Sequence, residues 1–407
     1  LDAALNLPPK TYSFGIKKMI AYEAARGSYE DAIEAVERYV GVKVSKRQAE
    51  EIVQEAAQDF DAFYGDGELK GESSADVNRL PLVVITTDGK GIVVRKEDLR
   101  QQTRVKAEQA STKLQKRLTK GEKRNRKRMA TVASVYQIDR HVRSIESIMG
   151  ELKSSDKSLK KDAKNFRPRP KNKRVWASIE KSQAEVIEEI FLEASSRDPK
   201  RKKEWVCLVD GDRRQLRQIR RLVRKYDVRV GVVLDIIHVI EYLWKAARVF
   251  YSDTDPQAEA WVSERLINIL DGRASNVAAG MTRSATLQRI NKTIRKPVDT
   301  CASYLLKNSP YLCYDEYLEK GWPIATGIIE GACRHLIKDR MDVTGARWSL
   351  DGAEAVLQIR SLKSSHHFEA YWQFYEKQEF MRNHHIFYKN ISVLSSLIGK
   401  TSEINST

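Results

Sequence analysis

The sequence predicts an α/β fold with a mixed β-sheet, an all-helical insertion and a helical N-terminal region. Apolar runs at 82–88 and 205–210 each stop at an aspartate, which is typical of buried strands in a sheet covered on both faces. Helix and strand patterns alternate between about 178 and 234, with one helix at about 178–195 and a basic helix at about 213–226, and such alternation predicts a mixed sheet. From 236 to about 317 the apolar spacing is almost purely helical. Core connections are normally short, so we interpret this stretch as an inserted domain.

Composition points to a polyanionic partner. The chain has 407 residues, enough for two or three domains, and 72 Lys and Arg against 55 Asp and Glu give a formal net charge of +17. Double-stranded DNA fits this excess, although membrane-surface and ribosomal proteins share it. No apolar run approaches the roughly 18 residues of a membrane span, so we expect no membrane partner. Four scattered cysteines and no visible signal peptide predict a cytoplasmic protein with reduced thiols rather than a zinc site.

Residues 1–75 are the predicted N-terminal helical region. One helix is expected from Ser28 to Val40, and a second opens at Ser45, where Gln48 three residues later matches a capping box. A helix, a Gly-containing turn and a second helix with basic residues at its start are what a DNA-reading helix-turn-helix requires. An ordinary helical hairpin has the same pattern. The residues expected to contact DNA here are Lys46, Arg47 and Gln48.

The first part of the core is predicted over 78–236, with more than one strand-like segment between 80 and 94 and strand patterns at 129–138, 205–210 and 228–234. Gly89 and Gly91 indicate a bend just past the first strand end at Asp88. An arm at 100–128 holds twelve Lys or Arg against two Glu, and a linker at 152–174 is rich in Lys, Ser and Pro. Either segment could contact phosphates or be only a solvated face. The expected DNA contacts are Lys123, Arg124, Arg126, Lys127 and Arg128 in the arm and Arg167 and Arg169 in the linker.

Three carboxylates carry the chemistry that the sequence suggests. Asp88 and Asp210 each end an apolar run, so one sheet edge can present both, and Glu330 lies in a helix-like stretch that can cover that edge. Carboxylates are the oxygen ligands that Mg²⁺ prefers. Each residue also has an ordinary interpretation. Both aspartates precede glycine and could be turn residues, and Glu330 with Arg334 could be an i,i+4 ion pair.

Four motifs resemble those of bacterial insertion-sequence DDE transposases, nearest the Kra-type group and related to the Mutator and hAT class. They are Asp88-Gly-Lys-Gly, Leu208-Val-Asp210-Gly, Leu234-Asp235-Ile-Ile-His238-Val, and the stretch from Glu330 to Trp348. The resemblance covers about 80–375. It implies an RNase H-like core, an insertion domain at 237–322, a final catalytic helix within 323–375 and a tail at 376–407. Arg334 and Arg347 of the last motif are further expected DNA contacts.

The same resemblance implies that Asp88, Asp210 and Glu330 are the catalytic ligands of two Mg²⁺ (or Mn²⁺) ions, with Asp235 and His238 as an auxiliary motif. Both Asp210 and Asp235 end apolar strands. In an RNase H-like sheet, the strand after the first long helix pairs with the first strand. That strand ends at Asp210, which favours Asp210 as the second catalytic carboxylate. For Asp235 and His238 we prefer a helix-capping or supporting role over direct metal binding.

The expected function is a transposase that binds the terminal inverted repeats of an insertion sequence and catalyses two-metal DNA cleavage and strand transfer. The sequence has no P-loop and no G-x-S-x-G motif, so no nucleotide cofactor or covalent intermediate is expected. Both transposon ends must be handled together, so we expect at least a homodimer of a bacterial, nucleoid-associated protein. The alternatives are an RNase H-like nuclease or resolvase without strand transfer, and a DNA-binding protein without catalysis.

Overall fold

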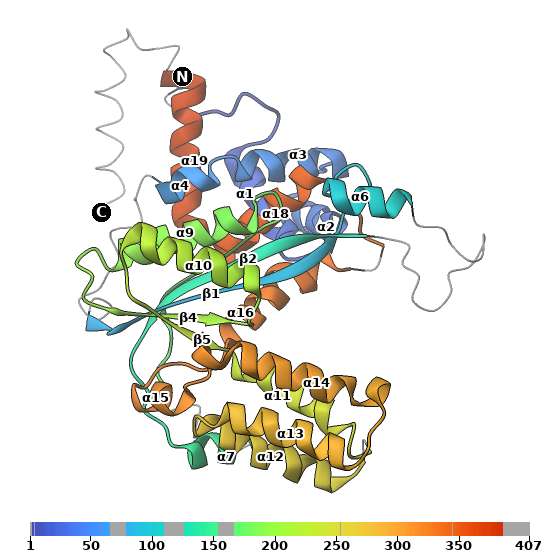
Figure 1. Ribbon diagram of the computed structural model, residues 1–407. Coiled ribbons are helices and arrows are strands. Elements are labelled where there is room, and N and C mark those ends of the chain that lie inside the picture. Colours follow the sequence, from blue (N-terminus) through green and yellow to red (C-terminus); the bar gives the residue numbers. More distant parts are fainter. Residues whose placement is uncertain are drawn as a thin grey trace.

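The computed structural model of the chain describes residues 2–3, 5–65, 79–109, 126–153, 167–252, 254–343 and 345–385. A mixed sheet lies at its centre in the strand order β3-β2-β1-β4-β5 (Figure 1). β1 is antiparallel to β2 and parallel to β4, while β2–β3 is antiparallel and β4–β5 parallel. The α/β prediction is confirmed, and this order is compatible with an RNase H-like core. The strands are β1 (Leu82–Val93), β2 (Lys127–Ile138), β3 (Lys171–Ser178), β4 (Glu204–Val209) and β5 (Val230–Leu234).

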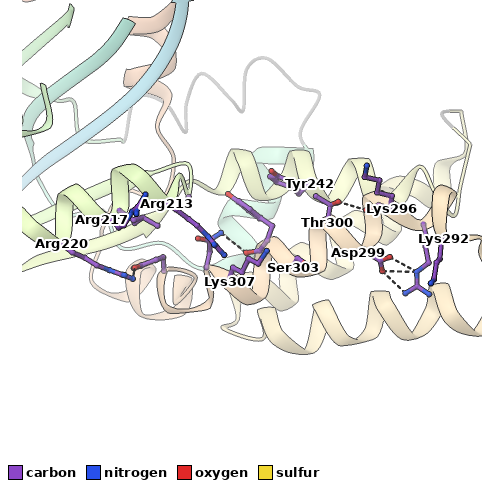
Figure 2. Close-up of a pocket in the computed structure, with 16 residues that line it drawn as sticks. Arg213, Arg217, Arg220, Tyr242, Lys292, Lys296, Asp299, Thr300, Ser303 and Lys307 are labelled. Atoms are coloured by element: carbon purple, nitrogen blue, oxygen red, sulfur yellow. Dashed lines mark hydrogen bonds and ion pairs between the residues drawn. The ribbon is translucent and has the colours of Figure 1, made fainter. Parts of the chain in front are cut away.

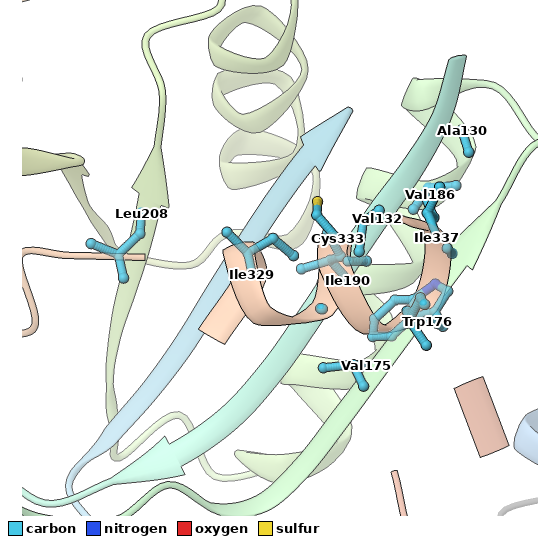
Figure 3. Packing of buried hydrophobic residues seen from close by; sticks show 14 of the residues in the cluster. Ala130, Val132, Val175, Trp176, Val186, Ile190, Leu208, Ile329, Cys333 and Ile337 are labelled. Carbon is cyan, nitrogen blue, oxygen red and sulfur yellow. The ribbon is translucent and has the colours of Figure 1, made fainter. Parts of the chain in front are cut away.

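Helices cover both faces of the sheet, which explains why β1 and β4 begin as continuous apolar runs. On one face α9 (Gln183–Arg197) packs on β2 and β1, and Glu189 of α9 accepts a hydrogen bond from the Trp176 indole of β3. The other face is covered by three elements from the C-terminal part of the chain, of which α16 and α18 are labelled in Figure 1. Figure 3 shows Cys333 beside Val132 of β2. The covering elements are α16 (Gly327–Ala332), the π-helix η3 (Cys333–Lys338) and α18 (Leu350–Ser364).

The N-terminal helices belong to the same hydrophobic core as the sheet. Helix α3 packs on α1 and α18, and the Tyr371 hydroxyl of α19 donates to the Ala56 carbonyl of α3 at 2.6 Å. The capping box expected at Ser45 and Gln48 is confirmed. The helices are α1 (Phe14–Ala24), α2 (Tyr29–Val40), α3 (Lys46–Ala57), α4 (Phe60–Gly65) and α19 (Phe368–Phe380), which continues into the π-helix η4 (Met381–His385).

A helical block separates β5 from α16, and in Figure 1 its four main helices lie together beyond the β5 edge of the sheet. Tyr314 and Tyr317 anchor it there, because their hydroxyls donate to backbone carbonyls of β5. No helix in the described ranges is both long and apolar enough to cross a membrane. The block and its flanking helix are α10 (Arg213–Tyr226), α11 (Ile236–Ala247), α12 (Pro256–Leu270), α13 (Ala274–Leu287), α14 (Lys292–Lys307), η2 (Ser309–Tyr311) and α15 (Tyr314–Glu319).

The first strand does not end at Asp88, contrary to the sequence prediction. β1 continues to Val93, and only its pairing with β4 stops, at Thr86. Gly89 and Gly91 do not form a bend; they allow β1 and β2 to lie close together. A Cβ on Gly91 would lie 2.9 Å from the Lys127 side chain on β2. Asp88 therefore lies in the middle of a long strand, at the point where its β4 neighbour ends.

The basic segments also contain more regular structure than predicted. The arm includes α6 (Gln101–Glu108) and the start of β2, and residues 110–125 lie outside the described ranges. The linker is preceded by α7 (Ile145–Lys153), and its last residues form the exposed start of the edge strand β3. Lysines suit such an edge because they discourage pairing with another chain. The predicted tail likewise begins inside α19, and residues 386–407 are not described.

Candidate active site at the sheet edge

Three aspartates lie level with one another where the parallel strands end. β1 and β4 pair in constant register from Leu82–Glu204 to Thr86–Leu208, and continuing that register by two residues brings Asp88 level with Asp210. β4 and β5 pair as far as Val209–Leu234, so Asp235 follows as the next member of the row. Side chains at matching positions of parallel strands point to the same face. The prediction that the strand ending at Asp210 neighbours the strand of Asp88 is confirmed.

Glu330 reaches this edge from the covering face. It lies on α16, which packs on β1 and β2, and three residues later Cys333 donates a hydrogen bond from its thiol to Oδ2 of Asp88 at 3.2 Å. In Figure 3 Ile329 and Cys333 project from α16 and η3 over the strands. Glu330, the residue after the buried Ile329, is exposed. The widened π-helical turn that starts at Cys333 is an uncommon element that occurs often at functional sites.

The electrostatics show that these carboxylates influence one another. Burial raises the pKa of the Asp210 carboxyl, and the negative charge of Asp88 raises it further. Partial loss of hydration raises the pKa of Glu330, and the carboxylates of Asp235 and Asp88 add to the effect. Carboxylates that repel each other in this way form a region of concentrated negative charge, which a cation would stabilise.

Asp235 has a structural role that the sequence predicted. It is fully buried, and its Oδ1 caps α11 by accepting a hydrogen bond from the Ile237 backbone N–H at 2.9 Å. Its Oδ2 accepts a hydrogen bond from the Thr326 hydroxyl. Burial raises the pKa of this carboxyl. Both oxygens are therefore already engaged in holding α11 and the segment before α16.

His238 lies in the first turn of α11, near the carboxylates. Its positive form lowers the pKa of Asp210, Asp235 and Glu330, so it stands within electrostatic reach of all three. Its Nδ1 is 3.9 Å from a carboxylate oxygen of Glu241, and its side chain is 34% exposed. A half-buried histidine in this position can offset part of the negative charge without acting as a ligand.

The donor chemistry of this edge fits a hard divalent cation, but the side chains do not form a closed metal site. In the described parts of the chain, no three His, Cys, Asp or Glu side chains stand together as they would around an ion. Two observations still support the fit. First, neighbouring carboxylates repel the negative charges of Asp210 and Glu330 and raise their pKa values. Second, Thr86 lies two residues before Asp88 on the same face of β1, and its Oγ1 is buried without a hydrogen-bond partner among the described residues.

The predicted DNA contacts fall into three groups. Lys123 and Arg124 lie outside the described residues. Several others already have protein partners. Arg128 donates to the carbonyls of Ile179 and Asp98, and Gln48 accepts hydrogen bonds in its cap and from the Tyr12 hydroxyl. In the same group, ion pairs join Lys46–Glu30, Arg47–Glu51, Lys127–Asp342, Arg167–Glu151 and Arg334–Asp339. In the third group, Arg169 and Arg347 are exposed and Arg126 is partly exposed.

Two consequences follow for the sequence interpretations. Arg334 pairs with Asp339 and not with Glu330, so the i,i+4 interpretation of Glu330 is wrong. Gln48 has a helix-starting role, while the exposed Lys46 and Arg47 remain available at the outer end of α3 because exposed ion pairs are weak. The four cysteines are free thiols, as expected.

Comparisons with known proteins add little to this geometry. No family model matches the chain, and no curated protein matches it. The chain is similar to a solved structure described as the Drosophila P element transposase strand transfer complex, with 8% sequence identity over 91% of this chain and 81% of that one. The TM-score is 0.27, and a likeness this weak carries no argument about fold or function.

Proposed function

We propose that this chain is a DDE-type transposase that cleaves transposon-end DNA and joins the resulting 3′-hydroxyl to target DNA. Asp88, Asp210 and Glu330 are its catalytic carboxylates. The observation that carries the proposal is the level placement of Asp88 and Asp210 at the ends of adjacent parallel strand pairings, with Glu330 on the covering helix close enough for the Asp88 charge to raise its pKa. The order of the four sequence motifs supports the same assignment.

Each residue of the site has a defined task in this proposal. Asp88, Asp210 and Glu330 would hold two Mg²⁺ or Mn²⁺ ions, which supply Lewis-acid stabilisation of the attacking and leaving oxygens. Cys333 fixes one oxygen of Asp88, and the Tyr304 hydroxyl fixes the Asp210 backbone by donating to its carbonyl at 2.9 Å. Asp235 fixes the start of α11 and therefore the direction of His238.

The direct test is metal-dependent nicking of supercoiled plasmid DNA. Asp88→Asn, Asp210→Asn and Glu330→Gln each delete a ligand charge with little change in volume. Each should lower the nicking rate by about 100-fold or more, which is the usual cost of removing a group that stabilises a transition state. DNA binding measured in EDTA should remain. Full activity in any of the three variants would remove that residue from the site.

A matched control is Asp212→Asn. Asp212 caps α10 only two residues after Asp210, and asparagine caps helices equally well. This variant should keep its activity, which shows that the loop tolerates the same chemical change. A joining assay with precut 3′-hydroxyl ends then separates the two enzymatic functions. Metal-dependent nicking without any joining would favour the nuclease alternative over the transposase.

A further inference from the structure

A strongly cationic groove begins beside Asp210 and runs along the helical block. It has a volume of about 1250 Å³ and is formed mainly by α10 and α14. In Figure 2 the labelled cations follow one another along the groove. Those on α10 are Arg220, Arg217 and Arg213, and those at the far end of α14 are Lys296 and Lys292. The α10 arginines are spaced i, i+4 and i+7, so they share one face of that helix. The groove residue Gly211 directly follows Asp210.

The positive charge of this groove is largely uncompensated. Its lining holds seven Lys or Arg residues but a single carboxylate, Asp299, which pairs with Arg295 at 2.9 Å. Within the described ranges, no carboxylate pairs with the five cations Arg213, Arg217, Lys292, Lys296 and Lys307. Elsewhere on this surface exposed cations are commonly paired, as Arg221 and Lys225 on the same helix are with Glu188. Unpaired like charges held close together favour a polyanionic occupant.

The groove is also linked physically to the candidate carboxylates. Tyr304 forms its wall, stacks on Tyr242 with ring centroids 4.1 Å apart, and donates its hydroxyl to the Asp210 carbonyl. These contacts place one end of the groove beside the Asp210 backbone, so a ligand held along the groove would lead to the candidate carboxylates.

Its length favours a polymer over a small anion. From Lys292 to Lys307 the α14 row spans about 22 Å at 1.5 Å per residue, before the α10 row is added. One DNA strand places a phosphate about every 3.4 Å along the duplex axis, so roughly six phosphates fit beside α14 alone.

We propose that the α10–α14 groove binds the phosphate backbone of the DNA that leads to the cutting site. This inference rests on the proposed function for the position of that site. A binding experiment distinguishes the two. The probe is a mixed-sequence DNA duplex, and its affinity is measured at increasing salt in EDTA, where no metal-dependent cleavage occurs.

The test variant is Arg217→Gln with Lys296→Gln, one cation from each helix. Losing two phosphate contacts should lower the slope of log K against log salt by about 1.8, since each contact contributes about 0.9. The matched control is Arg214→Gln with Arg283→Gln. These cations are also exposed, on α10 and α13, and have no carboxylate partner in the described ranges, but they do not line the groove. The control should keep the wild-type slope.

Three results would overturn the groove assignment. The first is an equal slope in wild type and groove variant, and the second is an equal loss of slope in the control. The third is tight binding of inorganic tripolyphosphate that only the groove variant loses, with no change in the DNA slope, which would make the groove a small-anion site. If the groove variant shows the expected loss of slope but the wild-type protein does not cut DNA, the groove assignment stands and the transposase proposal is rejected.

Discussion

Cys333 and Asp88 are joined by a hydrogen bond of 3.2 Å, although 245 positions separate them in the sequence. The bond connects the segment that carries Glu330 to the strand that carries Asp88. Burial raises the pKa of the Cys333 thiol, and the Asp88 charge raises it further, so the thiol stays protonated and donates. One buried thiol therefore adds a direct link between two of the three carboxylate-bearing segments, beside the packing of α16 on β1 and β2.

Replacing Cys333 tests this link. Cys333→Ala removes the donor and should raise the Mg²⁺ concentration needed for half-maximal nicking by about 10-fold, the lower end of the effect of residues that orient metal ligands. Cys333→Ser keeps a hydroxyl donor and should stay near wild type. Nicking titrations against Mg²⁺ measure both. If alanine and serine behave alike, the bond does not position Asp88.

Asp235 should matter for stability more than for chemistry. Asp235→Asn keeps an oxygen that can cap α11, so it should retain much of the nicking activity and most of the stability. Asp235→Ala loses the cap and should cost about 1 kcal/mol in the free energy of unfolding. Urea denaturation and nicking assays on the two variants give the answer. A folded but inactive Asp235→Asn protein would move Asp235 into the catalytic set.

Asp210 should destabilise the fold at neutral pH when no metal is present. Its folded-state pKa is raised above the ordinary value of 3.8, so its contribution to stability is full below that pH and is lost as pH rises through the raised value. Asp210→Asn cannot ionise and should be more stable than wild type at pH 7 in EDTA, with the difference vanishing below about pH 4.

Adding Mg²⁺ at pH 7 should make wild type more stable than Asp210→Asn. A ligand at 100 times its dissociation constant stabilises the protein that binds it by about 2.7 kcal/mol, and the variant should gain far less. Urea midpoints at pH 7 and pH 4, with and without Mg²⁺, measure all four conditions. A variant less stable than wild type in EDTA at pH 7 would contradict the electrostatic account.

A buried charge cluster should control stability far from the site. Glu193 is held between Arg174 and Arg197, and although burial opposes its ionisation, the two arginines lower its pKa to about 2. The Glu193 carboxylate therefore stabilises the fold above the pKa that it has in the unfolded chain, and this stabilisation is lost as pH falls towards 2. Glu193→Gln leaves two buried cations unpaired and should cost about 3–5 kcal/mol at pH 7.

The control for this prediction is Glu188→Gln on the same helix, where the carboxylate is paired with Lys225 at the surface. Exposed ion pairs contribute little, so its urea midpoint should match wild type. The Glu193 effect should also loosen α4, because the Arg174 guanidinium lies 3.4 Å from the centroid of the Tyr64 ring. Equal midpoints for both variants would show that the cluster is not a stabilising element.

Local signals in the sequence predicted much of this structure. Helix α10 was expected at 213–226 and is found at Arg213–Tyr226, because an aspartate cap and an apolar stripe mark it. The cap at Asp235 and the capping box at Ser45 are equally local. The local sequence does not show how far β1 continues past Asp88. Its length depends on pairing with β2, which follows the basic arm in the sequence.

Contacts between segments that are distant in the sequence could not be predicted either, because they too depend on the overall fold. The α10 arginines share a face at helical spacing, and the sequence did reveal a basic helix there. Only the packing of the helical block next to β5 brings the α14 lysines into the same groove. Likewise Cys333 looked like one of four scattered thiols, and only the fold places it on Asp88.

The central claim concerns which carboxylates hold the metal, and manganese located by anomalous scattering in crystals soaked with Mn²⁺ tests it most directly. We predict Mn²⁺ density bound by Asp88 and Asp210, with Glu330 completing the site and Asp235 still capping α11. Density bound by Asp235 in place of Asp210, or density remote from Asp88, would contradict the assignment.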